Sequence, residues 1–148
     1  MSPKVTTTSL PHAGVRAVGR WLLAGALAYA GFGHFVSSEE FLAQVPPWLP
    51  FPEAIVAISG VVEISLAAAL LFLSKQRVVV GWVTAAFFVI IFPGNVSQLV
   101  TGTDAFGLDS DLARAIRLLF QPLLVVWALW CTGAWHAWRR SRSGQTSE

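Results

Sequence analysis

The sequence has little charge and almost no cysteine. Only 12% of its 148 residues are charged and 55% are hydrophobic, whereas a soluble domain carries about 25% charged residues. This composition argues against a soluble globular protein and favours a membrane protein. The single cysteine, Cys131, excludes an internal disulfide and a Cys-x-x-Cys redox pair within the chain.

Ligands for a metal are also scarce. The three histidines form no Cys/His cluster, which argues against a structural metal site. His34 and His136 fall near opposite ends of apolar runs, so they cannot share one haem iron. A carboxylate-bridged di-iron site needs several inward carboxylates, and Glu63 is the only acid inside such a run. We therefore predict no metal and no cofactor held by the chain alone.

Four apolar runs of about the ~20 residues that a membrane-spanning helix needs occupy the chain. The predicted fold is all-α, a four-helix antiparallel transmembrane bundle spanning 15–138. Its spans are 15–36, 54–73, 78–100 and 112–138, with outer loops 37–53 and 101–111 and tails 1–14 and 139–148. The short link Ser74–Arg77 makes the second and third spans antiparallel neighbours.

Charge sorts the loops into two sides. Eight of the ten basic residues fall on one side, namely Lys4, Arg16, Arg20, Lys75, Arg77, Arg139, Arg140 and Arg142. The other side carries Glu39, Glu40, Glu53, Asp104, Asp109 and Asp111. The positive-inside rule then predicts cytoplasmic termini and a multi-pass protein of the bacterial cytoplasmic (inner) membrane. Ala28-Tyr29-Ala30 also resembles a signal-peptide cleavage site, so a cleaved first run is the alternative.

Polar residues interrupt the outer half of each run. Glu63 lies ~15 Å below Glu53, halfway through a hydrocarbon core of ~30 Å, where a charge is costly. Helical phase and depth predict one shared polar cavity, lined by His34, Glu63, Asn95, Arg117 and Gln121. Glu63 and His34 are its catalytic candidates.

Several polar residues in these runs also have a purely structural explanation. Glu63 could form a buried ion pair, with Arg117 as the partner. Asn95 could satisfy backbone carbonyls released by Pro93. Arg114 fits an arginine that reaches from the outer end of its helix to the membrane surface.

Five short motifs occur in order along the chain: Gly31–Phe35, Val45–Pro52, Ser59–Ile64, Phe92–Asn95 and Arg117–Gln121. Together they resemble the DoxX-like family of small four-span bacterial membrane proteins. The resemblance implies polar roles for the five predicted cavity residues and an association with membrane oxidoreductases.

Three functions fit the sequence. The first is a subunit or accessory of a quinone-linked membrane redox system, in which a bound quinone meets Arg117 or His34 and Glu63. The second is a small-molecule binding or transport module, because proline-interrupted spans with polar midplane groups suit a transport site. The third is a structural partner subunit. We expect the lipid bilayer as partner, together with a redox protein or a second copy, and no nucleic acid.

Overall fold

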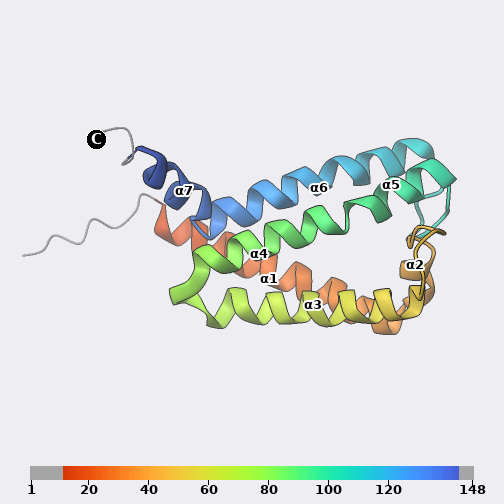
Figure 1. Ribbon diagram of the computed structural model, residues 1–148, viewed down its shortest axis with the longest axis horizontal. Coiled ribbons are helices and arrows are strands. Elements are labelled where there is room, and N and C mark those ends of the chain that lie inside the picture. Colours follow the sequence, from red (N-terminus) through yellow and green to blue (C-terminus); the bar gives the residue numbers. More distant parts are fainter. Residues whose placement is uncertain (1–11, 144–148) are drawn as a thin grey trace, which may run out of the picture.

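The structure, a computed structural model, describes residues 12–143 and is all-helical in this range (Figure 1). The helices in chain order are α1 (Ala13–Val36), α2 (Ser38–Leu42), α3 (Pro52–Phe72), η1 (Ser74–Gln76), α4 (Arg77–Ile90), α5 (Phe92–Thr101), α6 (Asp111–Cys131) and α7 (Ala134–Ser143). The described part of the chain contains no strand. The prediction of an all-α protein is confirmed.

Three helical stretches are long and apolar enough to cross a membrane: Pro52–Phe72, Ser74–Thr101 and Asp111–Cys131. They overlap the predicted second, third and fourth spans. The predicted first span is α1, which has 24 residues but carries Arg16, Arg20 and His34 and is not among the three. Large apolar side chains such as Tyr29 and Ile90 face outward, as on a surface that contacts lipid. These features favour membrane association.

Pro93 interrupts the third stretch. α4 ends at Ile90 and α5 begins at Phe92, with Pro93 in its first turn. Proline is tolerated there because the first helical turn leaves its N–H groups unpaired in any case. The carbonyl groups in the last turn of α4 are consequently open to donors from outside the helix.

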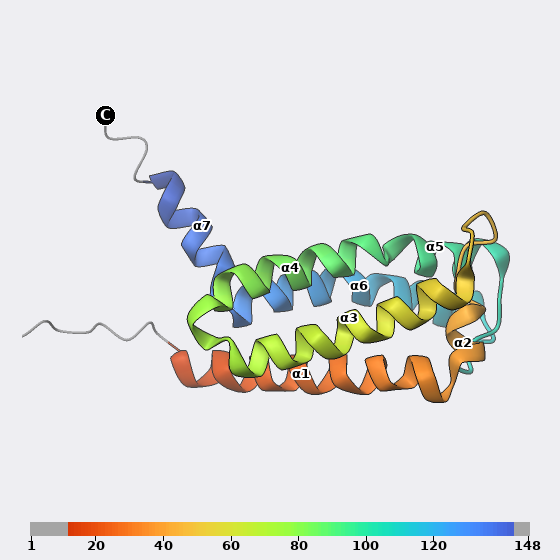
Figure 2. The same cartoon turned by 60° about the horizontal axis from the view of Figure 1, so that its bottom comes forward.

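The fourth stretch ends earlier than the sequence indicated. Ser110 caps α6, since its Oγ accepts from the Ala113 N–H at 3.3 Å. α6 then runs through Pro122 and ends at Cys131, whereas the predicted span continued to residue 138. Gly133 has a φ of 76°, a left-handed conformation that ends a helix and that glycine adopts without strain. α7 then leaves at an angle to α6 (Figure 2).

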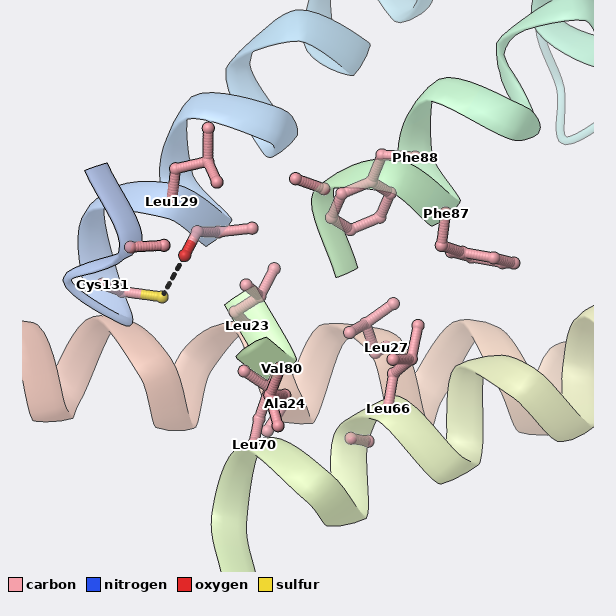
Figure 3. Close-up of a cluster of buried hydrophobic side chains, with 14 residues drawn as sticks. Leu23, Ala24, Leu27, Leu66, Leu70, Val80, Phe87, Phe88, Leu129 and Cys131 are labelled. Carbon is pink, nitrogen blue, oxygen red and sulfur yellow. Dashed lines mark hydrogen bonds between the residues drawn. The ribbon is translucent and has the colours of Figure 1, made fainter. Parts of the chain in front are cut away.

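The long helices run in alternate directions between two ends of the molecule (Figure 2). α1 packs along α3, and α6 packs against α1, α4 and α5. A dry core of leucine and aromatic side chains fills the half that contains η1; its largest members include Leu23, Leu70, Phe88 and Leu129 (Figure 3). The other half, which α2 closes, contains the five residues predicted to line a polar cavity.

Candidate functional site

A cavity of about 570 Å³ lies among α1, α3, α6 and the break between α4 and α5. Most of its wall is apolar, and Leu23, Leu27 and Phe88 belong both to this wall and to the dry core. The volume lies within the range of ~300–1,000 Å³ that small-molecule sites occupy. All five predicted cavity residues are in the wall: His34, Glu63, Asn95, Arg117 and Gln121.

Two glycines set the distance between α1 and α3. A Cβ atom on Gly31 would lie 2.9 Å from the Gly60 carbonyl oxygen and 2.8 Å from Cγ1 of Ile64. A Cβ atom on Gly60 would lie 2.8 Å from Cβ of His34. Because only glycine fits at both positions, the two backbones approach closely, as small residues allow in membrane helix pairs.

This close approach brings His34 and Glu63 together. Nε2 of His34 lies 3.4 Å from Oε2 of Glu63, within ion-pair distance. The side chains are 8% and 7% exposed, so both are deeply buried. The ionisable neighbour of Glu63 is thus His34. The ion pair with Arg117, which we gave as the alternative, is absent from the described residues.

The His34–Glu63 pair retains unused hydrogen-bonding capacity. Within residues 12–143, neither Nδ1 of His34 nor Oε2 of Glu63 has a hydrogen-bond partner. The His34 ring stacks on Phe41, with ring centroids 3.8 Å apart. Buried polar atoms in native proteins are nearly always paired, so unpaired atoms in a cavity wall point to a ligand or water.

Arg117 begins a directed chain of hydrogen bonds. Its Nε donates to Oδ1 of Asn95 at 3.3 Å, Nδ2 of Asn95 donates to Oε1 of Gln121 at 2.8 Å, and Nε2 of Gln121 donates to the Phe88 carbonyl at 2.7 Å. A guanidinium has no acceptor atom, so the amide beside it must present its oxygen. That choice then orients each following amide.

The Phe88 carbonyl that ends this chain belongs to the last turn of α4. The break before Pro93 leaves that turn needing external donors. We gave satisfaction of these released carbonyls as an alternative role for Asn95. In the structure Gln121, on the neighbouring helix α6, donates to the Phe88 carbonyl instead.

The other side of Arg117 contacts the segments that close this end of the molecule. Its Nη2 donates to Oε1 of Gln44 at 3.0 Å, and its Cζ lies 4.9 Å from the centre of the Phe106 ring. Phe106 packs edge-on against Phe41, and its N–H donates to the carboxylate of Glu40. The loop before α6 is thereby joined to α2.

Sequence reasoning missed Gln44 and misjudged Arg114. Gln44 is the one amide side chain among the apolar residues after α2, which was an available signal. Arg114 is 5% exposed and forms ion pairs with Asp104 and Asp111. It also donates to the Thr103 carbonyl, so it anchors the loop before α6 and is not an exposed arginine at the helix end.

The described residues contain no group of three His, Cys, Asp or Glu side chains that could hold a metal ion. His34 and Glu63 are the two such side chains in the cavity wall. The chemistry that the wall does offer is hydrogen bonding and charge. Its polar groups are one guanidinium, one His–Glu pair, the Ser59 hydroxyl, the Trp48 indole N–H and the amides of Gln44, Asn95 and Gln121.

No curated protein and no solved structure matches the chain. The expected membership of the DoxX-like family is wrong, because the family model that matches is a different one. The motifs that suggested the DoxX-like family are short and made of glycine, proline and polar residues. Small helical membrane proteins in general need such residues at close helix contacts, helix breaks and cavities. The match extends over residues 23–132, and the chain belongs to the family described as Domain of unknown function (DUF8561).

Proposed function

We propose that the chain crosses a bacterial cytoplasmic membrane four times as an antiparallel bundle with both termini in the cytoplasm. Support comes from the alternating directions of α1, α3, the α4–α5 pair and α6 (Figure 2) and from the positive-inside rule. The basic residues Arg16, Arg20, Lys75 and Arg77 lie at the end where α1 begins and α3 meets α4.

In this proposal α1 is the first span. Its 24 residues extend for ~36 Å, enough for a hydrocarbon core of ~30 Å. Arg16 and Arg20 lie in its early turns, from which long side chains reach the membrane surface. The tight packing of Gly31 against Gly60 supports a helix that is retained rather than a signal peptide that is removed.

Accessibility of single cysteines tests the topology. With Cys131→Ser as background, a cysteine at Ser38 is expected to react with an impermeant maleimide added outside the cell. A cysteine at Gly144 is expected to react only after the membrane is opened. Labelling of the Gly144 position in intact cells would contradict the orientation, and a mature chain starting near Gly31 would contradict the retained first span.

We further propose that the protein binds a small lipid-soluble molecule in the cavity. The observation that carries this proposal is a largely apolar cavity of about 570 Å³. Its wall includes buried polar atoms of His34, Gln44 and Glu63 that have no hydrogen-bond partner within the described residues. Interiors are otherwise close-packed, and buried polar groups are otherwise paired. A purely structural subunit has no need of such a space.

Purification in mild detergent, followed by mass spectrometry of the extracted small molecules, tests this function. Ala30 lines the cavity, so Ala30→Phe is expected to fill part of it and to remove the bound molecule. Tyr29→Phe places the same side chain at the adjacent, outward-facing position and serves as the matched control. Absence of a stoichiometric lipophilic molecule from the parent, or its retention in Ala30→Phe, would contradict the proposal.

A quinone-linked redox function is the second candidate, and the His34–Glu63 contact is the observation that favours it. Reduction of a quinone to a quinol takes two electrons, which a partner redox protein would supply, and two protons for its oxygens. A carboxyl beside an imidazole can deliver those protons. Glu63→Gln keeps the shape and removes this titratable group. A quinone among the extracted molecules, with quinone-dependent activity lost in Glu63→Gln, is the expected result; full activity in that variant would refute this candidate.

A further inference from the structure

We infer that the cavity takes an amphiphile with a carboxylate headgroup, which binds beside Arg117 and Gln44 while its apolar tail lies along the leucine-lined wall. This inference rests on the proposed ligand-binding function and specifies the chemical class of the ligand.

Arg117 is a cation surrounded by neutral partners. Its contacts are the amide oxygens of Asn95 and Gln44 and the ring of Phe106. No carboxylate within residues 12–143 lies at ion-pair distance from it. Glu63 faces His34, Glu40 accepts from the N–H of Phe106, and Arg114 pairs with the two aspartates Asp104 and Asp111. A guanidinium is always charged. Arg117 is partly buried, and a partly desolvated charge is more stable with a counter-charge beside it. The site therefore favours an anion.

Two donors at this end of the cavity have no acceptor in the described residues, one on Gln44 and one on Arg117. The oxygen of Gln44 faces Arg117, which directs its Nε2 elsewhere, and in the described residues this buried Nε2 has no acceptor. Arg117 uses Nε and Nη2 for its neighbours, and no bond to Nη1 is present in the same part of the chain. A carboxylate has two acceptor oxygens, one for each donor. With a single arginine, a singly charged head suits the site better than a doubly charged phosphate.

The rest of the wall suits an apolar tail. From Arg117, the α6 side of the cavity continues through Gln121 to Leu124, and the α1 side continues from Ala30 to Leu27 and Leu23. These last leucines border the dry core. A tail along this wall would replace empty space by packing contacts, which favours a long hydrocarbon over a small polar acid.

The cavity also has a side that an amphiphile could use to enter from lipid. Its wall includes Ile90 and Trp48, which are 73% and 71% exposed. α3 contacts α1, α2 and α4, whereas in the described chain it makes no contact with α5. In the proposed orientation this side faces the hydrocarbon region, where amphiphiles concentrate.

Photolabelling of the full chain in phosphatidylcholine nanodiscs tests the inference. The probes are a long-chain carboxylic acid with a mid-chain diazirine, the corresponding primary alcohol and the corresponding alkyl phosphate. The acid is expected to label cavity-wall peptides about tenfold more strongly than the alcohol. A hydrogen bond to a charged group is stronger than one to a neutral group by enough to raise the affinity about tenfold. Labelling by the acid is also expected to be stronger than labelling by the alkyl phosphate.

Variants at Arg117 complete the test. Arg117→Gln is expected to lower acid labelling about tenfold, to the level of the alcohol, whereas Arg117→Lys retains the charge and part of the labelling. Arg139→Gln on the exposed surface of α7 removes the same charge away from the cavity and is the matched control. Thermal unfolding of each variant shows whether a loss of labelling reflects a loss of folding.

The possible outcomes separate the two proposals. Equal labelling by acid and alcohol, or unchanged labelling in a folded Arg117→Gln, would overturn the carboxylate inference while leaving a lipophilic ligand in place. Stronger labelling by the phosphate would overturn the choice of head. Failure of every probe to label the cavity wall above a bilayer background would overturn the binding function itself.

Discussion

Gly31→Ala tests the contact on which the His34–Glu63 pair depends. The new Cβ would lie 2.8 Å from Cγ1 of Ile64, 2.9 Å from the Gly60 carbonyl oxygen and 3.1 Å from Cβ of Glu63. Backbone oxygen cannot move without its helix, so α1 and α3 have to separate. Overpacking of this kind costs about 1–3 kcal/mol.

The same helix provides the control. Gly25 also lies within α1, and a Cβ there would meet nothing within 4 Å. Both substitutions gain the same helix propensity, up to about 1 kcal/mol, so this contribution cancels in their comparison. Gly31→Ala is therefore expected to be about 1–3 kcal/mol less stable than Gly25→Ala.

Equilibrium unfolding in mixed micelles of a mild detergent and sodium dodecyl sulfate, followed by circular dichroism, measures this difference. Equal stability of the two variants would refute the reasoning, because it would mean that α1 and α3 do not pack at the distance described. A stabilised Gly31→Ala would refute it more strongly.

Three further predictions concern single hydrogen bonds and ion pairs. Gln121→Glu removes the donor to the Phe88 carbonyl and is expected to cost about 1–3 kcal/mol in the same unfolding assay; parental stability would contradict the directed chain. Arg114→Gln removes the ion pair with Asp104 and is expected to accelerate amide exchange in the loop before α6 but not in α3, as mass spectrometry can show. Trp127→Phe loses the 3.0 Å hydrogen bond from Nε1 to the Gly19 carbonyl and is expected to lower the free energy of unfolding by about 0.5–1.5 kcal/mol. An unchanged unfolding midpoint would contradict this prediction.

Much of the helical organisation could be predicted because it depends on local properties of the chain. Apolar runs of sufficient length predicted helices, and Pro93 predicted the interruption between α4 and α5. The end of α6 escaped prediction for a reason of the same kind. Apolar and aromatic residues continue beyond Gly133, and hydropathy does not register that this glycine adopts a left-handed conformation.

Membership of the cavity wall was also accessible from the sequence. A polar side chain inside an apolar helix must face the protein interior, and helical phase with depth then selects which residues share a level. The five predicted residues meet at one cavity for that reason. Their function stays a prediction, and the family assigned from short motifs was wrong.

The pairing of these groups was decided by tertiary structure alone. Helical phase says that Glu63, His34 and Arg117 point inward, but not which of them touch. The closeness of α1 to α3 at Gly31 and Gly60 joins His34 to Glu63, and a residue outside every predicted span, Gln44, joins Arg117 instead. The sequence by itself therefore determined which side chains turn toward the protein interior, because the cost of exposing a polar group to an apolar medium is a property of each residue. Their partners depend on the distance and rotation between helices, which arise from packing across the whole molecule.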